Sequence, residues 1–140
     1  MENKKVKITV EVTVNASLEK AWDYFTLPEH LTQWNFASED WHCPKASSDL
    51  RTGGKFSATM AAKDGSMSFE FGGTYDEVLK HKKIAYTMGD DRKVEVIFSS
   101  NNNSTQVVET FEAESENSIE LQKSGWQAIL TNFKKYTEAN

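Results

Sequence analysis

Residues 117–137, NSIELQKSGWQAILTNFKKYT, are the stretch of sequence that decides the fold. Apolar side chains recur there at the period of an α-helix, and Asn117 with Glu120 matches a capping box at the start. The pattern predicts a long C-terminal helix with an aromatic stripe, which needs a large apolar surface to lie on. The stripe consists of Ile119, Trp126, Ile129, Leu130, Phe133 and Tyr136.

The residues upstream of this helix supply that surface as a series of strands. Apolar and polar residues alternate with a period of two, which is typical of strands with one buried face. Asp64-Gly65 predicts a tight hairpin, and Gly72-Gly73 allows a bulge or a sharp coil. An antiparallel meander follows from this order. Its segments are 56–60, 67–71, 75–79, 84–88, 94–98 and 107–111.

The N-terminal part predicts one more strand and two short helices. Residues 5–14 alternate as a strand, Ser17 is suited to cap a first helix, and Pro28 to begin a second one that carries Trp34. The stretch 35–54 is the least periodic. We therefore expect an α+β fold in which a curved antiparallel sheet of about six to seven strands wraps around the C-terminal helix, with two short helices after the first strand.

Composition limits the classes of protein. The 140 residues fit one domain spanning 1–140, and a net charge of −5 argues against nucleic acid as a partner. No apolar run approaches the roughly 18 residues of a membrane span, and residues 1–6 lack the apolar stretch of a signal peptide. With Cys43 the only cysteine, no internal disulfide is possible, so we expect a cytoplasmic protein. No apolar stripe is left over to bury, which favours a monomer.

Several local sequences carry a resemblance to a known family, in the order in which they occur there. They are Ala21-Trp22, Pro28-Glu29-His30-Leu31 leading to Trp34, residues 49–56 (DLRTGGKF), Asp64-Gly65, residues 72–78 (GGTYDEV), and Gly125-Trp126 followed by Leu130 and Tyr136. The chain resembles the helix-grip fold of the Bet v-like, START-related superfamily (SRPBCC), and within it the activators of the heat-shock protein 90 ATPase. The resemblance implies a cavity between sheet and helix. Family members that stimulate the chaperone carry an additional domain, for which this chain has no room.

The inward-facing side chains have two interpretations. They form a dry core, or a subset lines a cavity for a small apolar or aromatic ligand. Gly125, in the middle of the long helix, indicates close packing against backbone or ligand, or else a tolerated kink. The candidate ligand-binding residues are Trp34, Trp41, His42, Phe56, Met60, Phe69, Phe71, Tyr75, Tyr86, Met88, Gln122, Trp126, Leu130 and Phe133.

The irregular stretch after Trp34 predicts a lid over that cavity. A connection that exposes Phe36 and Trp41 would forfeit the burial of large apolar side chains, so they should cover something. We expect Trp34, Trp41 and Trp126 to border one shared cavity or its lid, with His42 as the nearest titratable group. The alternative is that Trp41 plugs a dry core.

No catalytic residue, metal site or cofactor site is indicated. The glycine pairs do not match phosphate-binding loops, and His42 and Cys43 point to opposite faces of an extended strand. Among the acids within strands, Glu70, Glu95 and Glu109, alternation places the first two on the outer, solvated face. The inward polar candidates are His42, Tyr75, Tyr86 and Gln122, with no visible partner of the acid–base kind.

Three functions remain open at this stage. The favoured one is a small-ligand binder that uses the cavity between sheet and helix. The second is a chaperone-interacting, stress-response module of the heat-shock protein 90 activator type, as the resemblance implies. The third is a small enzyme that uses the same cavity. It is the least supported, because the sequence shows no nucleophile, general base or set of metal ligands.

Overall fold

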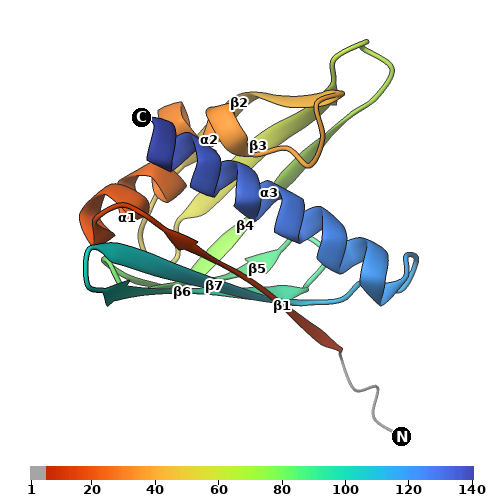
Figure 1. Ribbon diagram of the computed structural model, residues 1–140. Helices are drawn as coiled ribbons and strands as arrows, with labels where there is room; N and C mark the ends of the chain where they lie inside the picture. Colours follow the sequence, from red (N-terminus) through yellow and green to blue (C-terminus); the bar gives the residue numbers. More distant parts are fainter. Residues whose placement is uncertain (1–5) are drawn as a thin grey trace, which may run out of the picture.

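The computed structural model describes residues 6–140 (Figure 1). Position 5 of the predicted first strand, and the N-terminal residues that bear on a signal peptide, lie outside the described residues. Along the chain the elements are β1 (Lys7–Val14), α1 (Leu18–Thr26), α2 (Pro28–Trp34), β2 (Trp41–Ser48), β3 (Lys55–Ala62), β4 (Ser68–Leu79), β5 (Lys83–Met88), β6 (Lys93–Asn101), β7 (Ser104–Glu112) and α3 (Ile119–Ala139).

The strands form one seven-stranded antiparallel sheet in the order β1-β7-β6-β5-β4-β3-β2. Strands β2 to β7 pair with their neighbours in the chain, whereas β1 crosses over to pair with β7, with Lys7 opposite Glu112. The sheet curls around α3, with β1 and β2 at its two edges (Figure 1). This confirms the predicted α+β helix-grip fold.

The helix starts follow capping chemistry. Ser17 Oγ accepts a hydrogen bond from the Lys20 backbone N–H at 3.1 Å, and Pro28 is the first residue of α2. The capping box predicted at Asn117 is wrong. Ser118 caps α3 through its Oγ, which accepts from the Leu121 N–H at 3.1 Å.

The stretch that looked least periodic contains an edge strand. Strand β2 pairs with β3, with Trp41 opposite Ala62, and its register shifts between His42 and Lys45. Pro44 lies within that shift, where its missing N–H removes no regular ladder bond. The irregularity therefore hid a strand, and the expectation that residues 35–50 lack regular structure is wrong. Asn35, Ala37 and Ser48 of this segment line the cavity described below.

Gly72 and Gly73 allow neighbouring strands to approach closely. A Cβ added at Gly72 would lie 2.6 Å from the Phe56 carbonyl oxygen, and one at Gly73 would collide with the carbonyl oxygen of Thr87. The register shift in β4 falls later, between Tyr75 and Glu77. The glycines therefore provide the close approach of a coiled sheet, and the bulge lies beside them.

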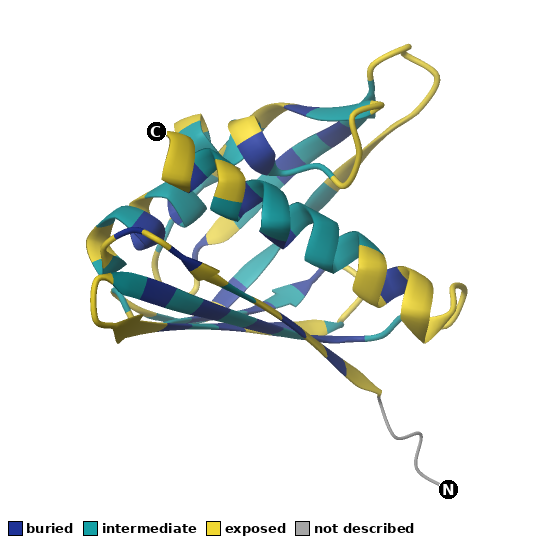
Figure 2. Cartoon of the chain, viewed as in Figure 1, coloured by how far each residue is buried: buried dark blue, intermediate teal, exposed yellow. Residues whose placement is uncertain are grey.

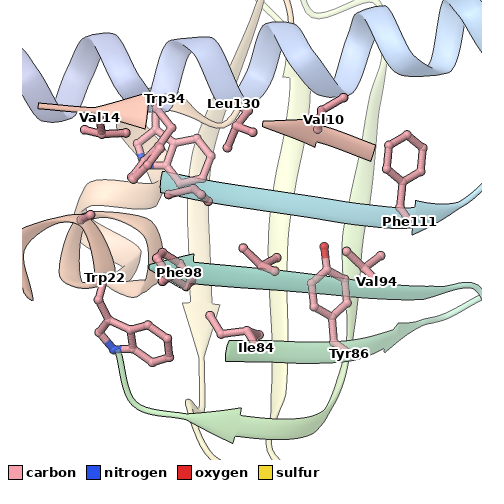
Figure 3. Close-up of a cluster of buried hydrophobic side chains, with 14 of the residues drawn as sticks. Val10, Val14, Trp22, Trp34, Ile84, Tyr86, Val94, Phe98, Phe111 and Leu130 are labelled. Carbon is pink, nitrogen blue, oxygen red and sulfur yellow. The ribbon is translucent and has the colours of Figure 1, made fainter. Parts of the chain in front are cut away.

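Helix α3 lies across the concave face of the sheet and covers the core (Figures 1 and 2). Phe133 is fully buried, with its ring 5.2 Å from that of Phe25 in α1 and 5.1 Å from that of Trp34 in α2. The C-terminal half of α3 is therefore held by both short helices as well as by the sheet. The fully buried residues also include Val96 and Val107, and Val14, Phe111 and Leu130, which Figure 3 labels.

The outer face of the sheet is charged, and substitutions there should be tolerated. Lys7, Glu11, Lys93 and Glu95 are exposed, and the ion pair of Glu95 with Lys83, at 3.5 Å, is a surface pair of little energetic value. We expect each single alanine variant of these four to stay within about 0.5 kcal/mol of the parent in urea unfolding. Losses above about 1 kcal/mol at two of them would indicate that another subunit covers this face.

Candidate ligand cavity

A cavity of about 400 Å³ lies between the concave face of the sheet and α3. This volume falls within the range of about 300–1,000 Å³ that is usual for small-molecule sites. Its walls come from all three helices and from strands β2, β3, β4, β5 and β7, and they are mainly apolar. The apolar lining includes Phe25, Leu31, Trp34, Phe56, Ala58, Met60, Phe69, Phe71, Ile84, Trp126, Ile129 and Leu130.

Aromatic contacts between the helix and the sheet hold the wall in place. The Trp126 ring of α3 stacks on Phe111 of β7, with ring centroids 3.8 Å apart, and meets the Phe71 ring at an angle, 6.2 Å away. Phe56 of β3 packs edge-on against Tyr86, at 4.8 Å. Side chains locked against one another in this way cannot relax into the open volume without losing these contacts.

The cavity reaches the surface between the β3–β4 hairpin and the first turns of α3. Phe69 of β4 and Leu121 of α3 both line it, yet they are 52% and 60% exposed. The hairpin and the start of the helix are both exposed in Figure 2. Two large apolar side chains therefore form a solvent-facing mouth.

Most of the predicted ligand-binding residues line this cavity, and their role in binding stays a prediction. Those that line it are Trp34, Phe56, Met60, Phe69, Phe71, Tyr75, Tyr86, Gln122, Trp126 and Leu130. Those that do not are Trp41, His42, Met88 and Phe133.

The residues outside the cavity are separated from it by their neighbours. Trp41 packs against Phe69, with ring centroids 5.9 Å apart. Phe69 lines the cavity and Trp41 does not. Phe133 faces α1 and α2 instead of the open volume. Neither Trp41 nor His42 lines the cavity, and the prediction that His42 is its nearest titratable group is wrong, because Glu109 and Tyr86 line it. Trp41 contacts Phe69 at the mouth, so its place in a lid stays a prediction. Met88 is a buried core residue at the end of β5.

Gly125 lines the cavity from the middle of α3. A Cβ built at this position meets no heavy atom within 4 Å, so the interpretation of close backbone packing is wrong. Because Gly125 has no side chain, the space beside it remains part of the cavity.

Gly125→Ala is therefore expected to stabilise the protein. The substitution removes the helix penalty of glycine and lowers the entropy of the unfolded chain without a steric clash. We expect the free energy of unfolding in urea to rise by about 0.5–1 kcal/mol. A loss of stability would show that the space beside Gly125 is filled in solution.

Two of the predicted polar candidates already have partners within the protein. The Gln122 side-chain oxygen accepts from the Glu114 N–H at 2.9 Å, and its nitrogen donates to the Asn117 carbonyl at 2.9 Å. The Tyr75 hydroxyl lies 2.8 Å from Ser48 Oγ. These groups fix the loop before α3 and the edge of the sheet, and have less capacity left for a ligand.

Glu109 is a functional candidate among the acids within strands, and the sequence leaves its face of the sheet unassigned. It lies in the middle of β7, in phase with the buried Val107 and Phe111, and is itself only 8% exposed. Its cross-strand neighbours are the buried Val10 and Val96. Burial in these apolar surroundings raises the pKa of its carboxyl group from 4.5 to about 8. Alternation along β7 was the signal that could have revealed it.

Tyr86 completes the polar part of the cavity. Its hydroxyl lies on the side of the sheet that faces α3 (Figure 3). Burial, and then the nearby Glu109 carboxylate, raise the pKa of this phenol well above its ordinary value. Neither the Tyr86 hydroxyl nor the Glu109 carboxyl has a hydrogen-bond partner among residues 6–140, although both residues line the cavity. Both groups therefore remain available to a ligand.

Metal chemistry has no support in the described part of the chain. Within residues 6–140, no group of three or more His, Cys, Asp or Glu is placed to hold a metal ion. Cys43 is buried beside Ala58 and Met60, and burial raises the pKa of its thiol, which disfavours the reactive thiolate.

Within residues 6–140, no helix has the length and apolar character needed to cross a membrane.

Comparison with known proteins points to one family. The model of the family "Activator of Hsp90 ATPase homolog 1-like protein" matches residues 15–138. The AHSA1-like protein from Aeromonas hydrophila is 42% identical, with a TM-score of 0.90, over 96% of this chain and 93% of that one. Chr148 from Cytophaga hutchinsonii is 56% identical, with a TM-score of 0.82 and the same coverage of each chain.

More distant structures share the fold alone. NE0264 from Nitrosomonas europaea is 16% identical, with a TM-score of 0.82 over 99% of this chain and 97% of that one. No curated protein gives a significant match to this sequence.

Proposed function

Because this chain belongs to the Activator of Hsp90 ATPase homolog 1-like family, we propose that it binds a small, mainly apolar or aromatic molecule in the cavity between the sheet and α3. The observation that carries the proposal is the cavity itself. A domain of this size normally fills its interior, yet about 400 Å³ stays open here between interlocked aromatic side chains. An apolar ligand would gain contacts that the protein does not make for itself.

Gly125 gives a sharp test of this proposal. Gly125→Leu places a branched side chain into the open volume, whereas Ser124→Leu places the same side chain at the neighbouring, exposed helix position. The measurement is an NMR titration with a panel of small aromatic and alicyclic compounds, which monitors the backbone amides of Phe69, Tyr86 and Trp126.

We expect at least one compound to shift these signals in the parent protein and in Ser124→Leu, and to lose most of its effect in Gly125→Leu. Circular dichroism and thermal unfolding of both variants establish that they are folded. A panel that shifts none of these amides would argue against the cavity as a binding site. Equal shifts in Gly125→Leu would place the ligand elsewhere.

A second candidate function is binding to heat-shock protein 90, and the family match favours it. Exposed apolar residues near the mouth of the cavity and on the β3–β4 hairpin offer a contact surface, because Met67 and Leu121 are among the most exposed large apolar side chains of the described chain. Titration with heat-shock protein 90 from the same organism should then show binding that Met67→Ser weakens. No binding at tens of micromolar would dispose of this candidate.

A further inference from the structure

A carboxyl group in an apolar cavity needs an explanation, because it is costly to bury without a partner. Glu109 projects from the centre of the sheet between Val10 and Val96, and the wall around it is built from aromatic and aliphatic side chains. Within residues 6–140 it makes no hydrogen bond and no ion pair. It is therefore free to interact with whatever enters the cavity.

The charged and titratable groups around the cavity leave Glu109 in its neutral form near pH 7. Those that line it are Tyr75 and Tyr86 from the sheet, Arg92 from the turn before β6, and Glu114 from the loop before α3, whereas α3 contributes no charged side chain. The Arg92 guanidinium donates to Asp90 at 2.7 Å and to the Glu112 carbonyl oxygen at 3.4 Å. Its charge acts on Tyr86, where it partly offsets the effect of burial on the pKa of the phenol. Burial alone accounts for the raised pKa of about 8. A neutral carboxyl carries one O–H donor.

The neighbouring phenol has the same character. Burial and the proximity of Glu109 keep the Tyr86 hydroxyl protonated, so it is a second O–H group on the same side of the cavity. Two O–H donors in apolar surroundings are complementary to an uncharged acceptor such as a carbonyl or hydroxyl oxygen. A cationic amine would be less well suited, because both charges would have to lose their water in a largely apolar cavity.

We propose that Glu109, as a neutral acid assisted by Tyr86, donates a hydrogen bond to the ligand, and that the cavity therefore selects uncharged aromatic or alicyclic molecules carrying a carbonyl or hydroxyl oxygen. The proposal rests on the proposed function, because it names the class of ligand that the same cavity takes. It goes further in assigning a specificity-determining residue. It also predicts that binding weakens as the acid ionises.

Three naphthalene derivatives of similar size test the selection directly. The probes are 2-acetylnaphthalene, 2-ethylnaphthalene and 1-(2-naphthyl)ethylamine, which differ in carrying a ketone, a hydrocarbon or an ammonium group. Their dissociation constants are measured by isothermal titration calorimetry at pH 7 and pH 9. We expect the ketone to bind about five- to tenfold more tightly than the hydrocarbon at pH 7. Because only the neutral acid donates, the affinity for the ketone should fall about tenfold by pH 9.

Two variants of Glu109 separate hydrogen bonding from packing. Glu109→Gln keeps an N–H donor and removes the titration, so it should retain the preference for the ketone and lose its pH dependence. Glu109→Leu removes the carboxyl donor, so most of the preference for the ketone should be lost and only the part that the Tyr86 hydroxyl supports should remain. Thermal unfolding and amide spectra establish that each variant is folded before its affinities are compared.

The outcomes distinguish this inference from the function on which it rests. Binding of the hydrocarbon without any preference for the ketone overturns the inference and leaves the cavity as a general apolar site. An amine that binds best, and more tightly at pH 9 than at pH 7, overturns it in favour of ion pairing. Failure of all three probes to bind, in a protein shown to be folded, counts against the binding function itself.

Discussion

Glu109→Gln should stabilise the protein by about 4 kcal/mol at pH 8, and by little at pH 4.5. In the unfolded chain this carboxyl loses its proton near pH 4.5, whereas in the folded protein it keeps the proton up to about pH 8. The unfolded state therefore binds fewer protons between these two values, and the stability of the parent falls as pH rises through that window. Each pH unit within it corresponds to about 1.4 kcal/mol for an uncompensated group.

Urea unfolding at several pH values between 4.5 and 9 measures this effect. The parent should lose stability across the window and level off above pH 8, whereas Glu109→Gln should show a flatter profile. The exposed acid Glu95 provides the control, since Glu95→Gln should follow the profile of the parent. Parallel curves for the parent and Glu109→Gln would mean that the acid is solvated and charged at neutral pH.

Phe133→Ala should lower the free energy of unfolding by about 3–5 kcal/mol, the usual cost of removing a fully buried phenylalanine. Its ring is 0% exposed and joins α3 to α1 and α2 through Phe25 and Trp34. The substitution leaves a void at a three-helix junction where the aromatic neighbours are already held by other contacts. Collapse of the site should therefore be incomplete.

Phe69→Ala makes the same chemical change at a side chain that is 52% exposed. We expect it to cost less than about 1 kcal/mol in the same urea titration, because much of its surface is already in water. An unfolding midpoint for Phe133→Ala close to that of the parent would show that α3 is not docked as described. A large loss in Phe69→Ala would show that the mouth is closed in solution.

The fold could be predicted because its decisive signals are local. The helical stripe around Trp126, the alternation of β6 and β7, and the Asp64-Gly65 turn each report one period or one turn geometry. Strand β2 could not be predicted in this way. Pro44 and the register shift break its alternation, and its pairing with β3 is a property of the sheet and not of the segment.

The candidate site could also be predicted only in part. The apolar wall could be predicted, since inward positions of the strands carry Phe56, Phe71 and Tyr86. For Gly125 the sequence leaves close packing and a tolerated kink both open, because it does not show whether a missing side chain is replaced by a neighbour or by empty space. Glu109 alternates in step with Val107 and Phe111, which predicts an inward side chain. Acids within strands are usually solvated, so the sequence alone does not decide which face Glu109 occupies.

The crossover of β1 to β7 has a consequence for how the protein is made. Every other strand pairs with one next to it in the chain, so β2 to β7 can assemble in order as they leave the ribosome. Strand β1 is synthesised before the other six strands, yet its partner β7 is complete only at Glu112. The first strand must therefore wait for most of the protein, and its alternating Lys, Thr and Glu side chains are of the kind that discourages an unpaired strand from joining another chain.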